Sequence, residues 1–300
     1  MIMNKPLSLS NKNFLSLSNL IRQSFTTLLF STILLLFSSC TTTKLLKETY
    51  SNPEVLPIEV LAPSPVKWEP IQDGFEISGD VVKTQRVSWH CVRIDLDNPK
   101  LSIVYAPHED SLGQLFNVKD FARQFHTVVA INAAPFLIET TNYPVGILKD
   151  GDNLISPVNT QYCALAFYRD ENHHLRAEIL NKQEEALDSK YTYAFGGFFT
   201  TYENGSFKKF QHNKRSRVGC GTSCNGRYLY IMVTTPFFHP TDRNGLNYEE
   251  CSLIFQKLGC DKAMQFDGGH SSALLVYTKD IEKPFMQRKV PTALGFVTRE

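Results

Sequence analysis

The sequence predicts an α+β protein: a single domain built on mixed or antiparallel β-sheet with a few helices. Three observations lead to this fold class. Predicted strands outnumber predicted helices, tight turns join many of the strands, and two helix–strand units each end in a polar residue. No internal repeat is evident beyond those two units. The domain is expected to occupy residues 74–300.

The first elements of this domain are two strands joined by a turn. Apolar residues alternate along 92–96 and again along 101–105, as they do in half-buried strands. Between them, residues 97–100 read DNPK, and Asp, Asn and Pro favour a turn. The pattern therefore predicts an antiparallel hairpin over residues 92–105.

The first helix–strand unit follows. Apolar residues recur at helical spacing over 117–125, and a short strand over 127–131 ends at Asn132. Further strands are predicted over the ranges 163–169, 177–180 and, after an Asn-Gly turn, 228–234.

The second unit repeats this construction. Asn247 and Glu250 have the spacing of a capping box, which starts a helix. Gly259 is placed to end that helix, and a strand over 263–266 ends at Asp267. Each unit thus delivers one polar side chain, Asn132 or Asp267, at a strand end directly before a turn.

The first 39 residues predict an export signal. They hold three basic residues and no acidic ones, and residues 25–37 form a 13-residue apolar stretch. This stretch is shorter than the roughly 20 residues that a membrane-spanning helix needs. Ser38-Ser39-Cys40 resembles a lipobox, in which Cys40 becomes the lipid-modified N-terminus, although Phe37 replaces the usual leucine. An ordinary secretory signal is the alternative. Either interpretation predicts export; the first predicts a lipoprotein anchored in the cell envelope, periplasmic or on the surface.

Residues 40–73 are predicted to tether the domain to the membrane. Five prolines lie between positions 53 and 70, and the segment has little periodicity. Without residues 1–39 the chain has 28 Lys and Arg against 30 Asp and Glu, a net charge of about −2. A nearly neutral domain lacks the basic surface that nucleic acids require, so no nucleic-acid partner is expected.

Six cysteines lie after Cys40. An even number in an exported protein is compatible with disulfides, whose pairing the sequence does not decide. A zinc site and a set of buried thiols are the alternatives. The six are Cys91, Cys163, Cys220, Cys224, Cys251 and Cys260.

The segment 267–272, which reads DGGHSS, is the strongest candidate for a functional site. A carboxylate at a strand end, followed by two glycines, places an ionisable group beside backbone that a ligand can approach closely. His270, Ser271 and Ser272 add donors on the same turn. A plain β-turn is the alternative, because Asp and Gly also favour turns for conformational reasons.

Several segments that occur in order resemble the phosphodiester glycosidase family, whose members include an enzyme that removes N-acetylglucosamine from a phosphodiester. The segments are AIN (130–132), RSRVG (215–219), GL (245–246), QFDGGHSS (265–272) and VPTALG (290–295). The resemblance covers roughly residues 89–297. It implies a hydrolase for a sugar linked through phosphate, with a carbohydrate-phosphate substrate and no organic cofactor. A divalent metal near Asp267 is compatible with the residues but not required.

Carried over by position, the resemblance implies a catalytic set and a substrate-binding set. Asp267 would stabilise or attack an oxocarbenium-like centre or act as a base on water. Arg215 would grip the phosphate, and Asn132 would orient a hydroxyl or a phosphate oxygen. The substrate-binding residues implied are Gly197, Gly268, Gly269, His270, Ser271 and Arg288. Lys214 and Arg217 are interpreted as solvated surface cations.

Three residues depart from the family pattern. Ala133 and Ala134 replace two glycines, and His270 replaces a third glycine. A second carboxylate, normally needed for glycoside hydrolysis, is not identified; Glu139 and Asp242 are candidates without a positional argument. The departures favour an alternative function, a non-catalytic lipoprotein that binds a surface glycan, and a purely structural envelope protein is a third interpretation.

Overall fold

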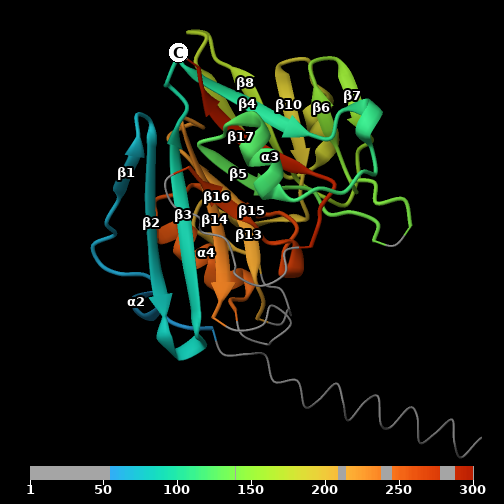
Figure 1. Ribbon diagram of the computed structural model, residues 1–300. Coiled ribbons are helices and arrows are strands. Elements are labelled where there is room, and N and C mark those ends of the chain that lie inside the picture. Colours follow the sequence, from blue (N-terminus) through green and yellow to red (C-terminus); the bar gives the residue numbers. More distant parts are fainter. Residues whose placement is uncertain (1–54, 139, 209–213, 238–244, 278–287, 300) are drawn as a thin grey trace, which may run out of the picture. The chain divides into compact units, whose positions relative to one another are not determined.

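The computed structural model describes residues 55–138, 140–208, 214–237, 245–277 and 288–299. These residues belong to the unit that begins at Glu54. They form three β-sheets with helices on the outer faces (Figure 1), and every strand pair among them is antiparallel. The predicted α+β class built on antiparallel sheet is confirmed. The predicted signal and Cys40 lie outside the described residues.

The largest sheet has eight strands, in the spatial order β1 (Glu69–Gln72), β2 (Phe75–Val82), β3 (Val87–Asp95), β14 (Tyr228–Pro236), β13 (Arg217–Ser223), β15 (Lys262–Gln265), β11 (Phe199–Glu203) and β12 (Ser206–Phe207). The second has five strands, in the order β7 (Asn153–Ser156), β6 (Leu148–Asp150), β10 (Tyr191–Gly196), β8 (Ala164–Arg169) and β9 (Leu175–Leu180). The third has four, in the order β16 (Leu274–Val276), β5 (Val129–Asn132), β17 (Ala293–Thr298) and β4 (Leu101–Ala106).

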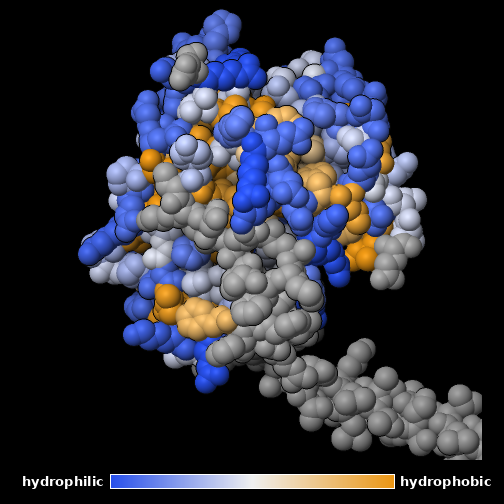
Figure 2. Space-filling model, in the orientation of Figure 1, coloured by the Kyte–Doolittle hydropathy of each residue, from blue (hydrophilic) through white to orange (hydrophobic). Residues whose placement is uncertain are grey.

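The α-helices of the described residues are α2 (Ile58–Leu61), α3 (Val118–Phe125) and α4 (Tyr248–Lys257). Short 3-10 helices cover Lys83–Gln85, Glu109–Ser111, Gln183–Leu187 and Gly269–Ser271. None of these helices is long and apolar enough to cross a membrane. Hydrophilic side chains cover most of the face shown in Figure 2, with hydrophobic ones gathered in patches between them.

The main hydrophobic core fills the space between the three sheets. It includes Ile231 of the eight-stranded sheet, Phe167 of the five-stranded sheet and Phe296 of the four-stranded sheet, all fully buried. A second core lies on the opposite face of the eight-stranded sheet, where Trp89 and Phe255 pack between the sheet and α4. The eight-stranded sheet is therefore covered on both faces, which explains why β13 is buried along its whole length.

Helix α4 begins where its capping box predicts. The Oδ1 atom of Asn247 accepts a hydrogen bond from the Glu250 N–H at 2.8 Å, and Glu250 Oε2 accepts from the Asn247 N–H at 2.9 Å. Two backbone donors at the helix start are thereby satisfied. Gly259, which follows the helix, has a φ of +92°. A glycine adopts this conformation without the steric cost that a side chain would add.

The predicted hairpin over 92–105 is wrong in its pairing. The turn exists, but β3 pairs with β2 and β14, whereas β4 pairs with β17 in another sheet. Both edges of β3 are already occupied, so the chain crosses at the turn from one sheet into the next. The Asn-Gly turn, in contrast, does join a hairpin, because β13 and β14 pair from Ser223 opposite Tyr228 onward.

The globular unit begins earlier than the predicted boundary at Gly74. Part of the expected tether is built into the fold, since α2 packs in the second core and β1 pairs with β2. Leu61 is fully buried, and its carbonyl accepts a hydrogen bond of 2.7 Å from the indole N–H of Trp89. The apolar side chains of this segment cover sheet surface that would otherwise be exposed. Residues 40–54 of the expected tether lie outside the described residues.

The six cysteines after Cys40 lie in the described residues, and all are free thiols. Five are buried and one, Cys224, is exposed. Burial raises the pKa of the Cys251 thiol to about 12, so it is uncharged at neutral pH. Of the three interpretations, buried thiols describe five of the six residues.

Candidate functional site

The loop that follows β15 forms the centre of the candidate site. Gly269 has a φ of +61°, in the left-handed region that glycine adopts readily. A Cβ atom at Gly268 would lie 2.9 Å from the carbonyl oxygen of Ser216, which is closer than real Cβ contacts come. The two glycines therefore allow the loop to turn sharply while its backbone lies directly against the start of β13.

Asp267 stands at the beginning of this loop. Its carboxylate accepts hydrogen bonds from the Ser271 hydroxyl and the Gly268 N–H, and Arg288 lies close enough to act on its charge. Partial removal from solvent raises the pKa of Asp267 to about 6, against the opposing effect of these three partners. The carboxylate therefore titrates just below neutral pH, a range suited to a general base.

Asn132 braces the loop. It is 1% exposed; its Nδ2 donates to the carbonyl of Asp267 at 2.8 Å, and its Oδ1 accepts from the Ala273 N–H at 2.9 Å. The single carboxamide thus ties both ends of the loop to the end of β5. This is the role of a satisfied strand-end residue, and a direct contact with substrate stays a prediction.

The two alanines after Asn132 fit without strain, since neither adopts a positive φ. The carbonyl of Ala133 accepts from the Asp267 N–H at 3.0 Å, and the carbonyl of Ala134 accepts from the Thr292 hydroxyl at 3.1 Å. The departure from glycine therefore leaves the backbone that supports Asp267 well bonded.

The predicted arginines lie beside the same loop. Arg288 donates its backbone N–H to the carbonyl of His270 at 3.2 Å. Arg215 is exposed and forms a backbone bridge with Leu246, while the next residue, Ser216, accepts a hydrogen bond from the Gly269 N–H at 2.9 Å. The structure thus brings Arg215, Arg288 and the loop together.

The interpretation of Lys214 and Arg217 as solvated surface cations is wrong, because both are 7% exposed. Lys214 Nζ lies 2.7 Å from Oε1 of Glu250, which is fully buried. The guanidinium of Arg217 lies 3.9 Å from the centre of the Tyr248 ring, and its Nε donates to the carbonyl of Leu246 at 3.2 Å. Residues 218–223 are apolar or small. This pattern is typical of a strand that is covered on both faces, and it could have predicted that the start of the strand is buried.

Gly197 lies next to the loop's strand but is packed into the protein. Its N–H donates to the carbonyl of Cys163 at 3.0 Å, and a Cβ atom there would lie 2.7 Å from the carbonyl oxygen of Gln265. Close packing thus accounts for this glycine, and its predicted contact with substrate is untested.

The candidates for a second carboxylate, Glu139 and Asp242, lie outside the described residues. Within the described chain, Glu250 is buried but engaged with Lys214 and the start of α4. No group of three or more His, Cys, Asp or Glu side chains suited to a metal gathers among the described residues. A divalent ion at Asp267 therefore stays a prediction.

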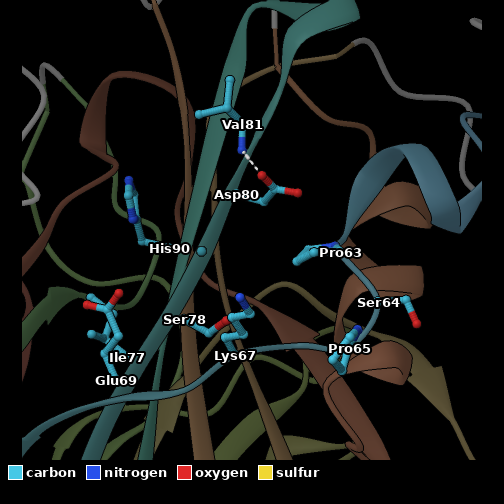
Figure 3. A pocket seen from close by; sticks show the side chains of 11 residues that line it. Pro63, Ser64, Pro65, Lys67, Glu69, Ile77, Ser78, Asp80, Val81 and His90 are labelled. Carbon is cyan, nitrogen blue, oxygen red and sulfur yellow. Dashed lines mark hydrogen bonds between the residues drawn. The ribbon is translucent and has the colours of Figure 1, made fainter.

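A cavity of about 760 Å³ lies at the edge of the eight-stranded sheet. Figure 3 shows Pro63 and Pro65 on one side of it and Asp80 and Val81 of β2 on the other, with His90 nearby. The Val81 N–H donates to Oδ1 of Asp80 at 2.7 Å. None of the predicted site residues lines this cavity.

Comparison with known proteins points to one family. The model of the phosphodiester glycosidase family matches residues 125–297, more than half of the chain. None of the curated proteins is similar enough to match.

Solved structures with the same fold include three from different organisms. A protein of Synechocystis has a TM-score of 0.61 at 15% identity, covering 78% of this chain and 64% of its own. This chain thus spans just under two thirds of that protein. The zebrafish N-acetylglucosamine-1-phosphodiester alpha-N-acetylglucosaminidase catalytic domain, auto-inhibited by its pro-peptide, has a TM-score of 0.58 at 16% identity, covering 83% and 86%. A protein of Burkholderia pseudomallei has 0.52 at 11% identity, covering 70% and 74%.

Proposed function

The chain belongs to the phosphodiester glycosidase family, and we propose that it hydrolyses the bond between the anomeric carbon of a sugar and a phosphodiester. The observation that carries this proposal is the environment of Asp267. One partly buried carboxylate, with a pKa of about 6, stands at a glycine loop beside Arg288. A base next to a phosphate-binding cation is what cleavage of a sugar–phosphate bond requires.

Asp267 acts on the sugar side of the bond. As the bond to phosphate lengthens, positive charge develops at the anomeric carbon, and the carboxylate stabilises it. At pH 7 most Asp267 side chains are ionised, because the pKa lies near 6. The carboxylate then takes a proton from the attacking water or itself attacks the carbon. The configuration of the sugar product, read by NMR, distinguishes inversion from retention.

The arginines act on the phosphate side. The leaving group departs as a phosphate monoester, which is already stable as an anion and needs little protonation. Arg215 and Arg288 supply the charge that holds its oxygens. Asn132 acts indirectly, since its amide keeps the backbone of Asp267 in place.

The test is hydrolysis of a panel of sugar-1-phosphodiesters by the full chain, with Asp267→Asn as the comparison. Turnover that disappears in a folded Asp267→Asn variant supports the glycosidase. A wild-type protein that binds a sugar phosphate without turnover, with equal affinity in Asp267→Asn, would refute it.

A glycan-binding protein without catalysis is the second candidate. It is favoured by the use of the Asn132 amide for backbone bonding and by the bulk of His270 in the loop. The same experiment separates the two, because a binder held by neutral contacts loses little affinity when Asp267 becomes Asn.

Export to the cell envelope and anchoring through Cys40 complete the proposal. Their support is the sequence of residues 1–40. In a bacterial host, Cys40→Ala should abolish metabolic lipid labelling and release the protein from membranes. Unchanged labelling and membrane association in that variant would refute the lipoprotein assignment.

A further inference from the structure

The outer edge of β2 is unpaired beside the cavity at the edge of the eight-stranded sheet. β2 pairs with β3 along its whole length, whereas β1 covers the other edge only as far as Ile77, which lies opposite Glu69. Beyond that point, no strand of the described residues covers residues 78–82 of β2. An unpaired strand edge presents backbone donors and acceptors that can pair with another extended chain.

Proline accounts for the end of the β1–β2 pairing. Continuing the register of β1 toward the N-terminus would place Pro65 opposite Val81. Proline has no N–H with which to extend the ladder, and no backbone hydrogen bond joins residues 63–67 to β2 in the described chain. The segment therefore runs apart from β2, and the cavity of about 760 Å³ lies between them, lined by Pro63, Pro65, Gly79 and Val81.

The strand register shows which backbone groups face this space. Pro70 of β1 has no N–H, so the hydrogen-bonded pair of the β1–β2 ladder is Glu69 with Ile77. The backbone groups of Ile77 therefore point to the outer edge of β2. Alternate residues of a strand direct their backbone groups to the same edge, so those of Gly79 and Val81 point outward as well.

Three of these outward groups are available to a ligand. The N–H of Val81 already donates to Oδ1 of Asp80 at 2.7 Å (Figure 3). The N–H and C=O of Gly79 and the C=O of Val81 have no hydrogen-bond partner among the described residues. One donor and two acceptors at the spacing of a strand match the backbone of an extended peptide, which binds open sheet edges in this way.

The charged side chains of the cavity favour a peptide with one basic residue. Lys67, Glu69 and Asp80 line it, so two carboxylates stand against one ammonium group. Asp80 uses one oxygen for the backbone of β2, and Figure 3 shows its other oxygen on the side of Pro63. Residues directly opposite each other in an antiparallel pair share a face of the sheet. A lysine or arginine opposite Asp80 therefore meets this carboxylate.

The residues on either side of that basic residue point to the other face of β2. Val81 on this face is 43% exposed, and an apolar residue opposite it would cover its side chain. A Cβ atom at Gly79 would lie 2.9 Å from Nδ1 of His90, so the imidazole occupies the place of a side chain there. A β-branched residue opposite Gly79 would pack beside this ring.

We propose that this cavity binds an extended peptide of a partner protein as an additional strand, antiparallel to β2 and with a basic residue opposite Asp80. The peptide N–H groups opposite Val81 and Gly79 donate to the carbonyls of those residues, and the Gly79 N–H donates to the peptide in return. Proline is therefore excluded from the peptide at both positions. None of the candidate site residues lines the cavity, so this site is independent of the hydrolysis proposed above.

The probe is a pentapeptide with blocked ends, Thr-Val-Lys-Val-Thr, whose binding to the full chain is measured by calorimetry. In the proposed register its first valine lies opposite Val81, its lysine opposite Asp80 and its second valine opposite Gly79. N-methylation of the second valine removes a donor and places a methyl group between the strands, so Kd should rise about 10-fold or more.

N-methylation of the lysine is the matched control, because the N–H of that residue points away from β2 and Kd should change less than about twofold. Equal effects of the two modifications, or no binding of the unmodified peptide, overturn the inference.

Variants of the protein locate the site. Val81→Pro blocks the edge without loss of a hydrogen bond to β3, because the N–H of residue 81 points outward, and Kd should rise about 10-fold or more. Asp80→Asn removes one cross-strand charge pair and should raise Kd about 2- to 5-fold. Asp152→Asn, in the exposed turn between β6 and β7, is the matched control and should leave Kd unchanged. A folded Val81→Pro variant with wild-type affinity overturns the inference.

Two further measurements complete the test. If Val81→Pro does not fold, hydrogen exchange of the wild type replaces it: the Gly79 amide should exchange more slowly when the pentapeptide is bound, and an unchanged exchange rate overturns the inference. Sedimentation tests whether a second copy of the chain covers this edge instead. A wild-type dimer that binds no pentapeptide, together with a monomeric Val81→Pro variant, would assign the edge to self-association and overturn the inference.

Discussion

Replacing Lys214 by methionine tests how the structure holds the segment of the candidate site that carries Arg215. Lys214 directly precedes Arg215, and its ammonium lies 2.7 Å from the fully buried carboxylate of Glu250. The same carboxylate accepts the N–H of Leu56 at 3.1 Å and that of Asn247 at 2.9 Å. One ion pair thus joins the strand start, helix α4 and the N-terminal segment.

The expected loss of stability follows from this burial. Removing one partner of a buried ion pair leaves the other charge uncompensated, which typically costs about 3–5 kcal/mol. For a domain of this size, each kcal/mol lowers Tm by roughly 2–4 °C. The Lys214→Met variant should therefore unfold about 6–20 °C below the wild type.

Circular dichroism during heating measures this effect. Lys257→Met is the matched control, because Lys257 is exposed on the same helix and its ammonium donates to the Ser64 hydroxyl at 3.3 Å, without an ion pair to a carboxylate of the described residues. Glu250→Gln retains an acceptor for the capping box, so the double variant Lys214→Met/Glu250→Gln should lose less than the two single variants together. A Tm for Lys214→Met within about 2 °C of the control would refute the reasoning.

Three further predictions concern the loop and the thiols. The pKa of Asp267 is raised to about 6 in the folded protein, so the stability associated with its protonated form is present below pH ~4 and is lost as pH rises through 6. Asp267→Asn should therefore raise Tm at pH 7.5 but not at pH 4. The kcat/KM of the wild type should rise as pH increases through about 6, and a kcat/KM that does not change with pH would contradict this. Gly269→Ala and Gly205→Ala each place a side chain at positive φ in open space, so both should lose about 1 kcal/mol in chemical denaturation; only Gly269→Ala should lower activity, and equal activities would contradict the site. In the native protein a maleimide should label Cys224 quickly and the five buried thiols only after unfolding; fast labelling of Cys91 would contradict the structure.

Local signals in the sequence were sufficient for several elements. The capping box of Asn247 and Glu250 and the positive φ at Gly259 involve residues close in sequence, so their chemistry can be recognised without the fold. The strand ends at Asn132 and Asp267 were also predicted, and the structure joins them by a hydrogen bond of 2.8 Å. The ordered segments were enough to identify the family.

Strand partners were not predictable in this way. The turn over 97–100 was visible, but β3 pairs with β14, which lies more than 130 residues later in the chain. Alternating apolar residues show that a segment is a strand and do not show which strand it joins. The predicted hairpin failed for this reason.

The fold class, the family, the starts and ends of the main helices, and the loop that carries Asp267 could all be inferred from the order of the amino acids. The folded chain was needed to see that the Asn132 amide is hydrogen-bonded to that loop and that Lys214 and Arg217 are buried. Burial and contacts between strands depend on covering elements, here α4 and β15, and the positions of these elements are set by packing between residues far apart in the chain.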